Sequence, residues 1–388
     1  MKRLLPLLLT LLLLATLFVG CSSSSPSASP GNSESPSNSS PGTSPSDSGE
    51  PAPSEKTDLK VGMVTDSGSV DDKSFNQSAW EGIKAAAALY STADPLYLKP
   101  ASETPADYSA AIQNLYDNGC RLIVCPGFLF SPTIYEMQDK LPDCKFLLID
   151  ETPHTEDYSD FKTASNTVSV VFAEHESGFL AGLAAALKIQ DGNLGFVGGM
   201  QVPAVERFNW GFQQGVKYAN DTYGTTCAIN PDDVVYQGTF NDSAAGGQLA
   251  KVMYDRGVKV VFGCGGITGN GALYEAAEQR TGGKEVWAVG VDTDQYDLGL
   301  YGAGNDSAVL TSAMKGVRQC AYDITVDFLK GEFTGGRDLT YNAASDGVGI
   351  PEQNPNLGSD ITDKVADAFA KMKDGSLVVS NTKGDLIG

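Results

Sequence analysis

Between about Asp58 and Asp150 short apolar runs alternate with longer amphipathic stretches, and this alternation constrains the fold more than any other feature. The apolar runs are "LKVGMVT", "PLYLKP", "RLIVCP" and "KFLLID". Their length and composition are typical of buried strands. The stretches between them, "NQSAWEGIKAAAALY", "DYSAAIQNLYDNG" and "SPTIYEMQDKL", repeat apolar residues every three or four positions, as helices do. Strands that alternate with helices predict a parallel sheet with helices on both faces.

A second series of the same kind follows "TVSVVFAEHESGFLAGLAAALKI". Its expected strands are "NLGFVGG", "DVVYQGTF", "VKVVFGCGG" and "EVWAVGVD", and helical patterns lie between them. Two series of similar length predict an α/β protein with two Rossmann-like lobes. We expect lobe 1 over 58–165 and lobe 2 over 166–292. The elements beyond 292 are too few for a third domain, so parts of 293–345 and of 346–388 are expected to complete lobe 1 and lobe 2, respectively.

The first 20 residues have the features of a secretory signal peptide. A basic start precedes an apolar run from Leu4 to Val19, whose 16 residues are fewer than the roughly 20 that a membrane-spanning helix needs. The run ends in "LFVGC", which is similar to a lipobox, with Phe18 at the position where leucine is usual. We therefore expect a signal peptide over 1–20 and a lipidated, for example palmitoylated, Cys21. An ordinary cleaved signal followed by a chance cysteine is the alternative.

Residues 21–57 are rich in Ser and Pro. After Cys21 the stretch has no large apolar residue over 36 positions, so it cannot bury a core and is expected to be disordered. Flexible-chain scaling gives such a tether a reach of roughly 30 to 40 Å. These features predict a cell-membrane lipoprotein whose folded part lies on the extracytoplasmic face.

Charge and cysteine usage exclude some classes of partner. The formal net charge of −21 argues against nucleic acid and anionic lipid surfaces, because both repel an acidic protein. The six cysteines after Cys21 match no zinc-binding spacing, and several lie in apolar runs. We expect buried thiols, with a disulfide between Cys120 and Cys144 as an open alternative.

The loops that follow the expected strands collect residues suited to a small ligand. In open parallel sheets, ligands bind beyond the carboxyl ends of the strands. Aromatic rings can stack on a flat ring, carboxylates accept hydrogen bonds from hydroxyls, and glycines let a ligand approach the backbone. The residues at these positions are Asp66, Asp72, Phe75, Phe128, Phe208, Phe240, Gly265, Gly266 and Asp292. The pattern predicts a cleft for a flat ring that carries a polyol.

The segment "VTDSGSVDDKSFNQSAWEGI" closely resembles the opening motif of the basic membrane protein family, the purine-nucleoside-receptor-like solute-binding lipoproteins of ABC importers. The resemblance continues, in order, through "SVVFAEHESGFLAG", "GFVGGMQVPAVERFNWGFQQGV", "GTFNDSAAGGQLA", "FGCGGITGNGALYEAA", "VGVDTDQ" and "VLTSAMKGV". It implies a type I periplasmic-binding-protein fold, in which two lobes joined by a hinge close around the ligand. It also implies a purine nucleoside as ligand and an ABC permease and its ATPase as partners.

The resemblance implies roles for residues near the base. Phe75 is expected to form one face of an aromatic sandwich, and Phe240 the other, with Phe208 as the alternative. Asp66 and Asn76 are expected to make polar contacts. Each has a structural alternative: Phe75 can pack beneath its helix, Asp66 can cap a turn, Asn76 can cap a helix, and Phe240 or Phe208 can belong to the core or hinge.

The resemblance also implies roles near the sugar. Asp292 matches the carboxylate expected to accept hydrogen bonds from ribose hydroxyls, and Lys315 is expected as a further polar contact. Lys315 can instead pair with Asp292 when the cleft is empty. Gly265 matches a close approach of the backbone to the ligand. For residues 71–73 the structural alternative is a solvated charge cluster that has no role in the site.

Other functions remain open at this level. The ligand can be another solute, such as a flavin or a sugar-like molecule, and the protein can serve a sensor rather than an importer. A nucleoside hydrolase is a third class, because the carboxylates Asp66 and Asp292 can form a catalytic pair. No catalytic motif with histidine is present, and the only histidines are His154 and His175. We therefore expect a binding protein, with no catalytic residues, no metal and no cofactor.

Overall fold

The computed structural model describes residues 55–388. The expected signal peptide, Cys21 and nearly all of the expected tether lie outside these residues. All described residues belong to one compact unit, Pro51–Gly388, which contains two six-stranded sheets. In the described part of the chain, no helix combines the length and the hydropathy needed to cross a membrane.

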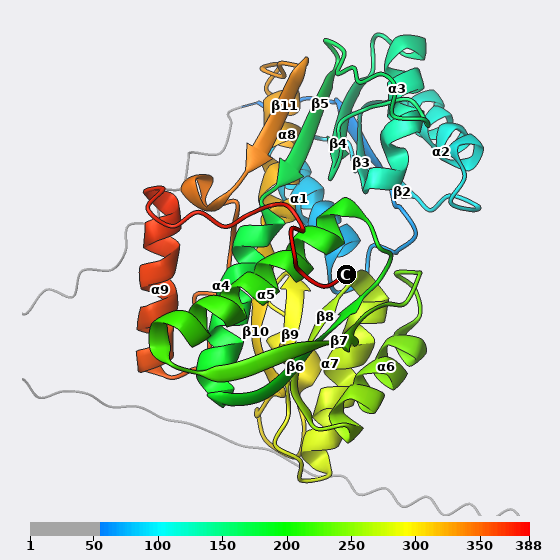
Figure 1. Cartoon of the computed structure of the whole chain (residues 1–388). Helices are drawn as coiled ribbons and strands as arrows, with labels where there is room; N and C mark the ends of the chain where they lie inside the picture. The colour runs from blue at the N-terminus through cyan, green and yellow to red at the C-terminus, as the bar shows by residue number, and fades with distance from the viewer. Residues whose placement is uncertain (1–54) are drawn as a thin grey trace, which may run out of the picture. The chain divides into compact units, whose positions relative to one another are not determined.

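The first sheet is built mainly from the first series of strands (Figure 1). Its order is β11-β5-β4-β3-β1-β2, with every pairing parallel. Its strands are β1 (Lys60–Val64), β2 (Leu96–Leu98), β3 (Cys120–Pro126), β4 (Lys145–Ile149), β5 (Thr167–Phe172) and β11 (Arg337–Tyr341). Successive residues of a strand point to opposite faces, so Leu122 and Val124 pack on one side and Ile123 and Cys125 on the other. Helices α1 (Phe75–Tyr90) and α8 (Val317–Leu329) cover the first side, and α2 (Pro105–Asp117) and α3 (Ser131–Lys140) cover the second.

The second sheet has the order β12-β10-β9-β8-β6-β7, and only the short β12 pairs antiparallel. Its strands are β6 (Asp191–Gly198), β7 (Thr226–Tyr236), β8 (Val258–Cys264), β9 (Trp287–Asp292), β10 (Val309–Lys315) and β12 (Val348–Gly349). Helices α4 (Glu174–Ile189) and α5 (Pro203–Tyr223) cover one face, and α6 (Ser243–Asp255) and α7 (Gly266–Thr281) cover the other. The 3-10 turns η1 (Phe128–Phe130), η2 (Tyr296–Gly299) and η3 (Ala343–Ser345) lie in connecting loops. These layers agree with the expected α/β fold of two Rossmann-like lobes.

Within the described residues the chain passes between the sheets after β5, after β10 and after β11. Hydrogen bonds join these crossings: Ala173 N donates to Tyr341 O (2.9 Å), and Gly316 N donates to Gly347 O (2.8 Å). The boundary expected at 165/166 differs from this arrangement, because β5 pairs with β4 and so lies in the first sheet. The passage into the second sheet therefore follows Phe172.

Glycines bring α4 and α5 into close contact. A Cβ on Gly182 would lie 2.1 Å from Phe212 O, and a Cβ on Gly211 would lie 2.0 Å from His175 O. No side chain fits at such distances, so the small residues of "GFLAGL" and "GFQQG" are required by the packing. This contact sets the start of α4 beside the start of α5, where Glu174 pairs with Arg207.

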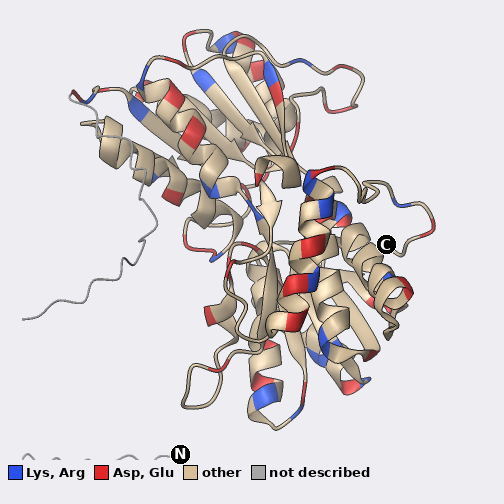
Figure 2. Cartoon of the chain, turned by 90° about the vertical axis from the view of Figure 1, so that its left-hand side faces the viewer, with Lys and Arg blue, Asp and Glu red and all other residues tan. Residues whose placement is uncertain are grey.

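The outer helix α9 (Ser359–Lys373) carries both acidic and basic residues along its length (Figure 2). Two of its ion pairs, Lys364–Asp360 and Lys371–Asp367, have the i,i+4 spacing of solvated helix surfaces. Only Val365, Ala368 and Met372 of this helix are buried. Such pairs contribute little to stability, so α9 is held by its apolar face.

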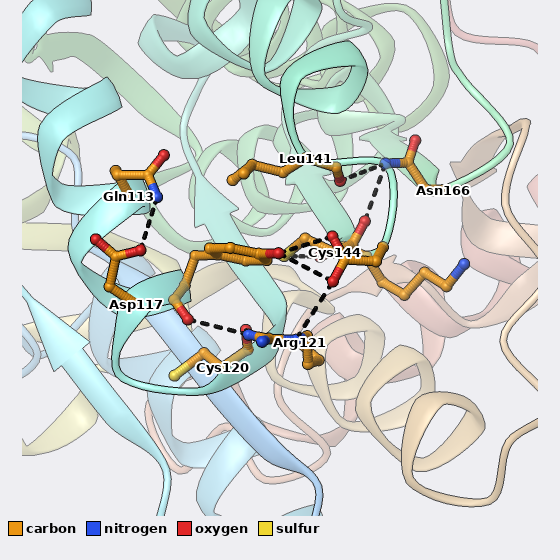
Figure 3. A network of polar contacts seen from close by, with 10 residues as sticks. Gln113, Asp117, Cys120, Arg121, Leu141, Cys144 and Asn166 are labelled. Atoms are coloured by element: carbon orange, nitrogen blue, oxygen red, sulfur yellow. Dashed lines mark hydrogen bonds and ion pairs between the residues drawn. The ribbon is translucent and has the colours of Figure 1, made fainter.

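Buried cysteines lie near the turn between α3 and β4, within a polar network that Figure 3 shows. The Asn166 side chain donates to Leu141 O (3.2 Å) and to Cys144 O (2.9 Å). Cys120 and Cys144 are both buried and both free thiols, as are the other four described cysteines. The alternative of a disulfide between Cys120 and Cys144 is therefore wrong.

Candidate functional site

A cavity lies between the two sheets, at the carboxyl ends of their strands. Its empty space, counted out to the open mouth, is about 650 Å³. All eight expected ligand-binding residues line it: Asp66, Phe75, Asn76, Phe208, Phe240, Gly265, Asp292 and Lys315. Further lining residues include Asp72, Phe128, Asp150, Cys264 and Ile267. The cavity thus gathers loops from both sheets, as the strand-end pattern predicts.

The β1–α1 loop is organised by Asp72. Its Oδ1 accepts from Ser74 N (2.9 Å) and Gln77 N (3.1 Å), and its Oδ2 accepts from Asn76 N (3.0 Å). These bonds satisfy backbone N–H groups at the start of α1 that have no partner within the helix. Asp72 is 2% exposed, so it is a buried cap and not part of a solvated charge cluster. This one side chain thus satisfies three backbone N–H groups at the start of α1.

Asn76 orients Asp66. Its Nδ2 donates to Asp66 Oδ1 (2.9 Å) and to Asp72 Oδ2 (2.9 Å), and its Oδ1 accepts from Asp66 N (3.3 Å). Gly68 N donates to the same Asp66 Oδ1 (2.9 Å). A Cβ on Gly127 would lie 3.0 Å from Asp66 Oδ2, so glycine leaves room for this oxygen. Burial raises the pKa of Asp66 to about 7, against the lowering effect of the Gly68 and Asn76 hydrogen bonds.

Four phenylalanines line the cavity, two from each lobe. Phe75 and Phe128 come from the first lobe, and Phe208 and Phe240 from the second. Phe208 is 2% exposed and packs edge-on against Phe262, with ring centroids 6.0 Å apart. Phe240 is only half-buried, and a Cβ on Gly199 would lie 2.3 Å from its ring. Phe240 is therefore the more accessible of the two aromatic faces in the second lobe.

Asp292 ends β9 with a left-handed backbone, φ 66°. Its Oδ2 accepts from Ser74 Oγ of the first lobe (2.5 Å). Burial raises the pKa of Asp292 to about 6, although the charge of Lys315 and the Ser74 hydrogen bond oppose this. The other oxygen of Asp292 accepts no hydrogen bond from a side chain or backbone group of residues 55–388, so this buried carboxyl is suited to accept hydrogen bonds from a ligand.

Lys315 is the buried cation at the back of the cavity. Its Nζ lies 2.6 Å from Asp150 Oδ1 and 3.2 Å from Glu174 Oε1, and Arg207 pairs with the other Glu174 oxygen at 2.7 Å. Burial opposes the charge, but Asp150, Glu174 and Asp292 together raise the pKa of Lys315. The structure differs here from the expected pairing of Lys315 with Asp292. Asp150 follows a buried strand, as Asp66 and Asp292 do, so the same pattern identifies it.

The Lys315 ammonium also lies near three aromatic rings. It is 5.0 Å from the centroid of Phe75, 5.2 Å from that of Phe172 and 5.8 Å from that of Phe208. Contacts within about 6 Å of a ring face are attractive. The cation is therefore held between carboxylates and rings, close to the cavity wall.

The chain at Gly265 allows only glycine. Its φ is +156°, and a Cβ there would lie 2.5 Å from Gly199 N. The residue precedes α7, whose first residues Gly266 and Ile267 also line the cavity. A ligand can thus approach backbone N–H groups at a helix start. Among residues 55–388 no group of three or more His, Cys, Asp or Glu side chains is placed to hold a metal ion.

The raised pKa values of Asp66 and Asp292 predict opposite effects of acid on stability and on binding. Both carboxyls have folded-state pKa values above the usual 3.8, so the folded protein takes up protons between about pH 4 and pH 7. The ligand-free protein should gain stability as pH falls through this window. A ligand whose hydroxyls donate to ionised Asp292 should bind less tightly below pH about 6. Melting temperatures and titration calorimetry from pH 5 to pH 8 measure both trends, and parallel trends would contradict the assignment.

Comparisons with known proteins give the chain a family and a fold. A family model described as ABC transporter substrate-binding protein PnrA-like, Bmp, matches residues 59–383. A relative from Lactococcus lactis named "ABC transporter nucleoside-binding protein BmpA" is 34% identical over 333 residues, which cover 84% of this chain and 90% of the relative. A "CD4+ T-cell-stimulating antigen" from Listeria monocytogenes is 35% identical over 334 residues, covering 83% of this chain and 88% of that protein.

A solved structure of an ABC transporter system solute-binding protein from Aeropyrum pernix K1 has a similar fold. Its TM-score is 0.72 at 24% sequence identity, and the match covers 84% of this chain and 94% of that one. At this identity the likeness carries the fold alone. It agrees with the expected periplasmic-binding-protein architecture of two lobes.

Proposed function

The chain belongs to the Bmp family of PnrA-like substrate-binding proteins of ABC transporters, and on that basis we propose that it binds a purine nucleoside between its two lobes. Proteins of this family act outside the cytoplasm, where they bind a small molecule and deliver it to an ABC transporter. They are not enzymes.

One observation carries the choice of ligand: half-accessible aromatic rings and buried polar groups lie in the same cavity. Phe75 comes from the first lobe and Phe240 from the second, and both line it. A purine between them gains stacking of about 0.5–1.5 kcal/mol per pair beyond area burial. Asp292 and Lys315 then face the ribose, and Asp66 faces the base. The printed name of the Lactococcus lactis relative supports this choice.

The polar groups suit a nucleoside better than a charged ligand. The cavity is lined by the carboxyls Asp66, Asp72, Asp150 and Asp292 and by one ammonium, Lys315. Carboxylates accept hydrogen bonds from N–H and O–H groups. A phosphate would meet these carboxylates with unfavourable charge. We therefore propose a neutral nucleoside.

We propose that the folded part is tethered to the extracytoplasmic face of the cell membrane. The basis is the lipobox-like "LFVGC" and the Ser- and Pro-rich stretch that follows Cys21. A tether of this length lets the closed form reach a permease, which with its ATPase takes the ligand. Metabolic labelling with a fatty acid tests the anchor, and a Cys21→Ser chain that still labels would contradict it.

Ligand-induced thermal stabilisation tests the proposed ligand. A chain beginning at Pro51 contains both sheets and the described core, and it is the protein to use. At a hundredfold excess over the dissociation constant, saturation adds about 2.7 kcal/mol to the free energy of unfolding. We expect inosine or guanosine to raise the melting temperature by several degrees, and riboflavin and sugars to leave it unchanged. A shift with riboflavin or a sugar alone would replace the nucleoside by another solute.

Matched variants locate the site in the same assay. Phe75→Ala and Phe240→Ala should each remove most of the inosine shift, because each removes one stacking face. Phe161→Ala is the control, because Phe161 is an exposed aromatic of a first-lobe loop and does not line the cavity. An undiminished shift in both cavity variants would place the ligand elsewhere.

A further inference from the structure

Three amide side chains of the second lobe reach backbone carbonyls of the β1–α1 loop in the first lobe. Asn270 Nδ2 donates to Asp72 O (2.8 Å), and Gln295 Nε2 donates to Lys73 O (2.8 Å). Asn241 Nδ2 donates to Ser67 O. Because the acceptors are main-chain atoms, these contacts depend on the shape of the loop and not on its side chains.

The orientation of the Gln295 and Asn270 amides is fixed by their other partners. Val291 N donates to Gln295 Oε1 (2.9 Å), which leaves the Gln295 NH₂ group facing Lys73. The same NH₂ group donates to Asn270 Oδ1 (2.9 Å), which leaves the Asn270 NH₂ group facing Asp72. Asn270 is 4% exposed and Gln295 2% exposed. Both NH₂ groups are thus buried and held toward their backbone carbonyl acceptors.

The two amides do not line the cavity, yet they connect the segments that do. The loop they hold carries Asp66 at its start and leads into Phe75. Gln295 lies three residues after Asp292, which itself accepts from Ser74 of that loop. Contacts between the lobes and contacts with a ligand therefore involve the same two stretches of chain.

We propose that Asn270 and Gln295 are positioning residues that hold the two lobes together and set ligand affinity without touching the ligand. When the lobes separate, the amides and carbonyls bond to water instead, so each bond favours the closed form by its net value only. A ligand that needs both lobes binds with an affinity scaled by the closed fraction. This inference rests on the proposed function for its ligand arm, but lobe closure itself can be tested without any ligand.

The thiol of Cys264 reports closure in the ligand-free protein. Cys264 lines the cavity and is 2% exposed, so separation of the lobes should speed its reaction with a thiol reagent. Gln295→Glu keeps the acceptor for Val291 N and removes both donated bonds at pH 8. Asn270→Ala removes the bond to Asp72 O. At about 1 kcal/mol per bond, each variant should react about fivefold faster at Cys264, as measured by mass spectrometry of the labelled peptide.

Gln213→Ala is the matched control. Its buried amide donates to Asn209 Oδ1 (2.8 Å) and Ile387 O (2.8 Å), and neither bond reaches the β1–α1 loop. We expect its Cys264 to react as in the parent chain. Reaction rates of Gln295→Glu and Asn270→Ala equal to those of the control would overturn the proposal.

Inosine binding provides the second arm. Gln295→Glu and Asn270→Ala should each release inosine about fivefold faster, with little change in the association rate. Unchanged inosine release would also overturn the proposal. If the parent chain binds no nucleoside, the proposed function fails, and the Cys264 rates alone decide on the positioning residues.

Discussion

Replacing Lys315 by methionine is expected to lower the free energy of unfolding of the ligand-free protein by about 3–5 kcal/mol at pH 7.5, the usual cost of removing one partner from a buried ion pair. The Lys315 side chain is 2% exposed, and Asp150 and Glu174 lie within 3.2 Å of its Nζ. Arg207 remains beside Glu174 in the variant, so Asp150 is the carboxylate that loses its partner. Methionine keeps the length and the apolar stem of lysine, so the loss is mainly electrostatic. Urea unfolding followed by circular dichroism measures it.

The dependence on pH and on Asp150 separates this cause from a packing defect. Burial already raises the pKa of Asp150 against the opposing charge of Lys315. Without that charge the carboxyl should take up a proton, so the deficit should shrink as pH falls to about 5. The double variant Lys315→Met with Asp150→Asn should recover most of the stability at pH 7.5. A deficit that is independent of pH and survives in the double variant would contradict this account.

The arrangement of layers could be predicted from the sequence because it depends on local periodicity. The runs "RLIVCP" and "KFLLID" identify β3 and β4 as buried strands by their apolar residues alone. The sheet that a strand joins depends on its partner, which local sequence does not contain. The pairing of Ile149 with Val170 spans the long loop between β4 and β5. The lobe boundary was therefore misplaced by one strand.

The residues that line the candidate site could be predicted from the sequence, but their contact partners could not. Residues after buried strands must lie at the carboxyl edge of a sheet, so Asp66 and Asp292 could be placed there from sequence. Which groups come into contact across the lobes depends on the exact placement of each side chain in the folded protein. Lys315 lies against Asp150, while Asp292 meets Ser74. Neither partner follows from spacing along the chain.

The sequence did not reveal the two residues whose amides donate to backbone carbonyls of the other lobe, and the reason is different. Asn270 and Gln295 lie in "TGNG" and "DTDQ", where an amide looks like an ordinary loop residue. Their partners are main-chain oxygens of residues about 200 positions away. A carbonyl is present at every position, so no sequence signal marks the ones that are used.

Replacing Asp292 by asparagine is expected to weaken inosine binding about a hundredfold. Hydrogen bonds to a charged group contribute about 1.5–3 kcal/mol each, and two ribose hydroxyls can donate to one carboxylate. Asparagine retains the size of the side chain and tolerates the left-handed backbone at this position, φ 66°. The variant should therefore fold normally, and titration calorimetry at pH 7.5 measures its affinity.

Stability should move in the direction opposite to affinity. Burial raises the pKa of Asp292 to about 6, which means that the ionised carboxyl destabilises the empty protein above that pH. Asparagine carries no charge, so the ligand-free variant should unfold at a higher temperature than the parent at pH 7.5 and at the same temperature near pH 4. On the proposed assignment, the parent keeps a costly charge in the cavity because the ligand would use it.

Asp346→Asn is the matched control for Asp292→Asn. Asp346 also has a left-handed backbone, φ 54°, but it is exposed, pairs with Lys373 and lies outside the cavity. The Asp346→Asn variant should bind inosine as the parent does. An affinity of Asp292→Asn within threefold of this control would remove Asp292 from the ribose contact, and Asp66 would then be the carboxylate to test, because it too is buried, raised in pKa and at a strand end facing the cavity.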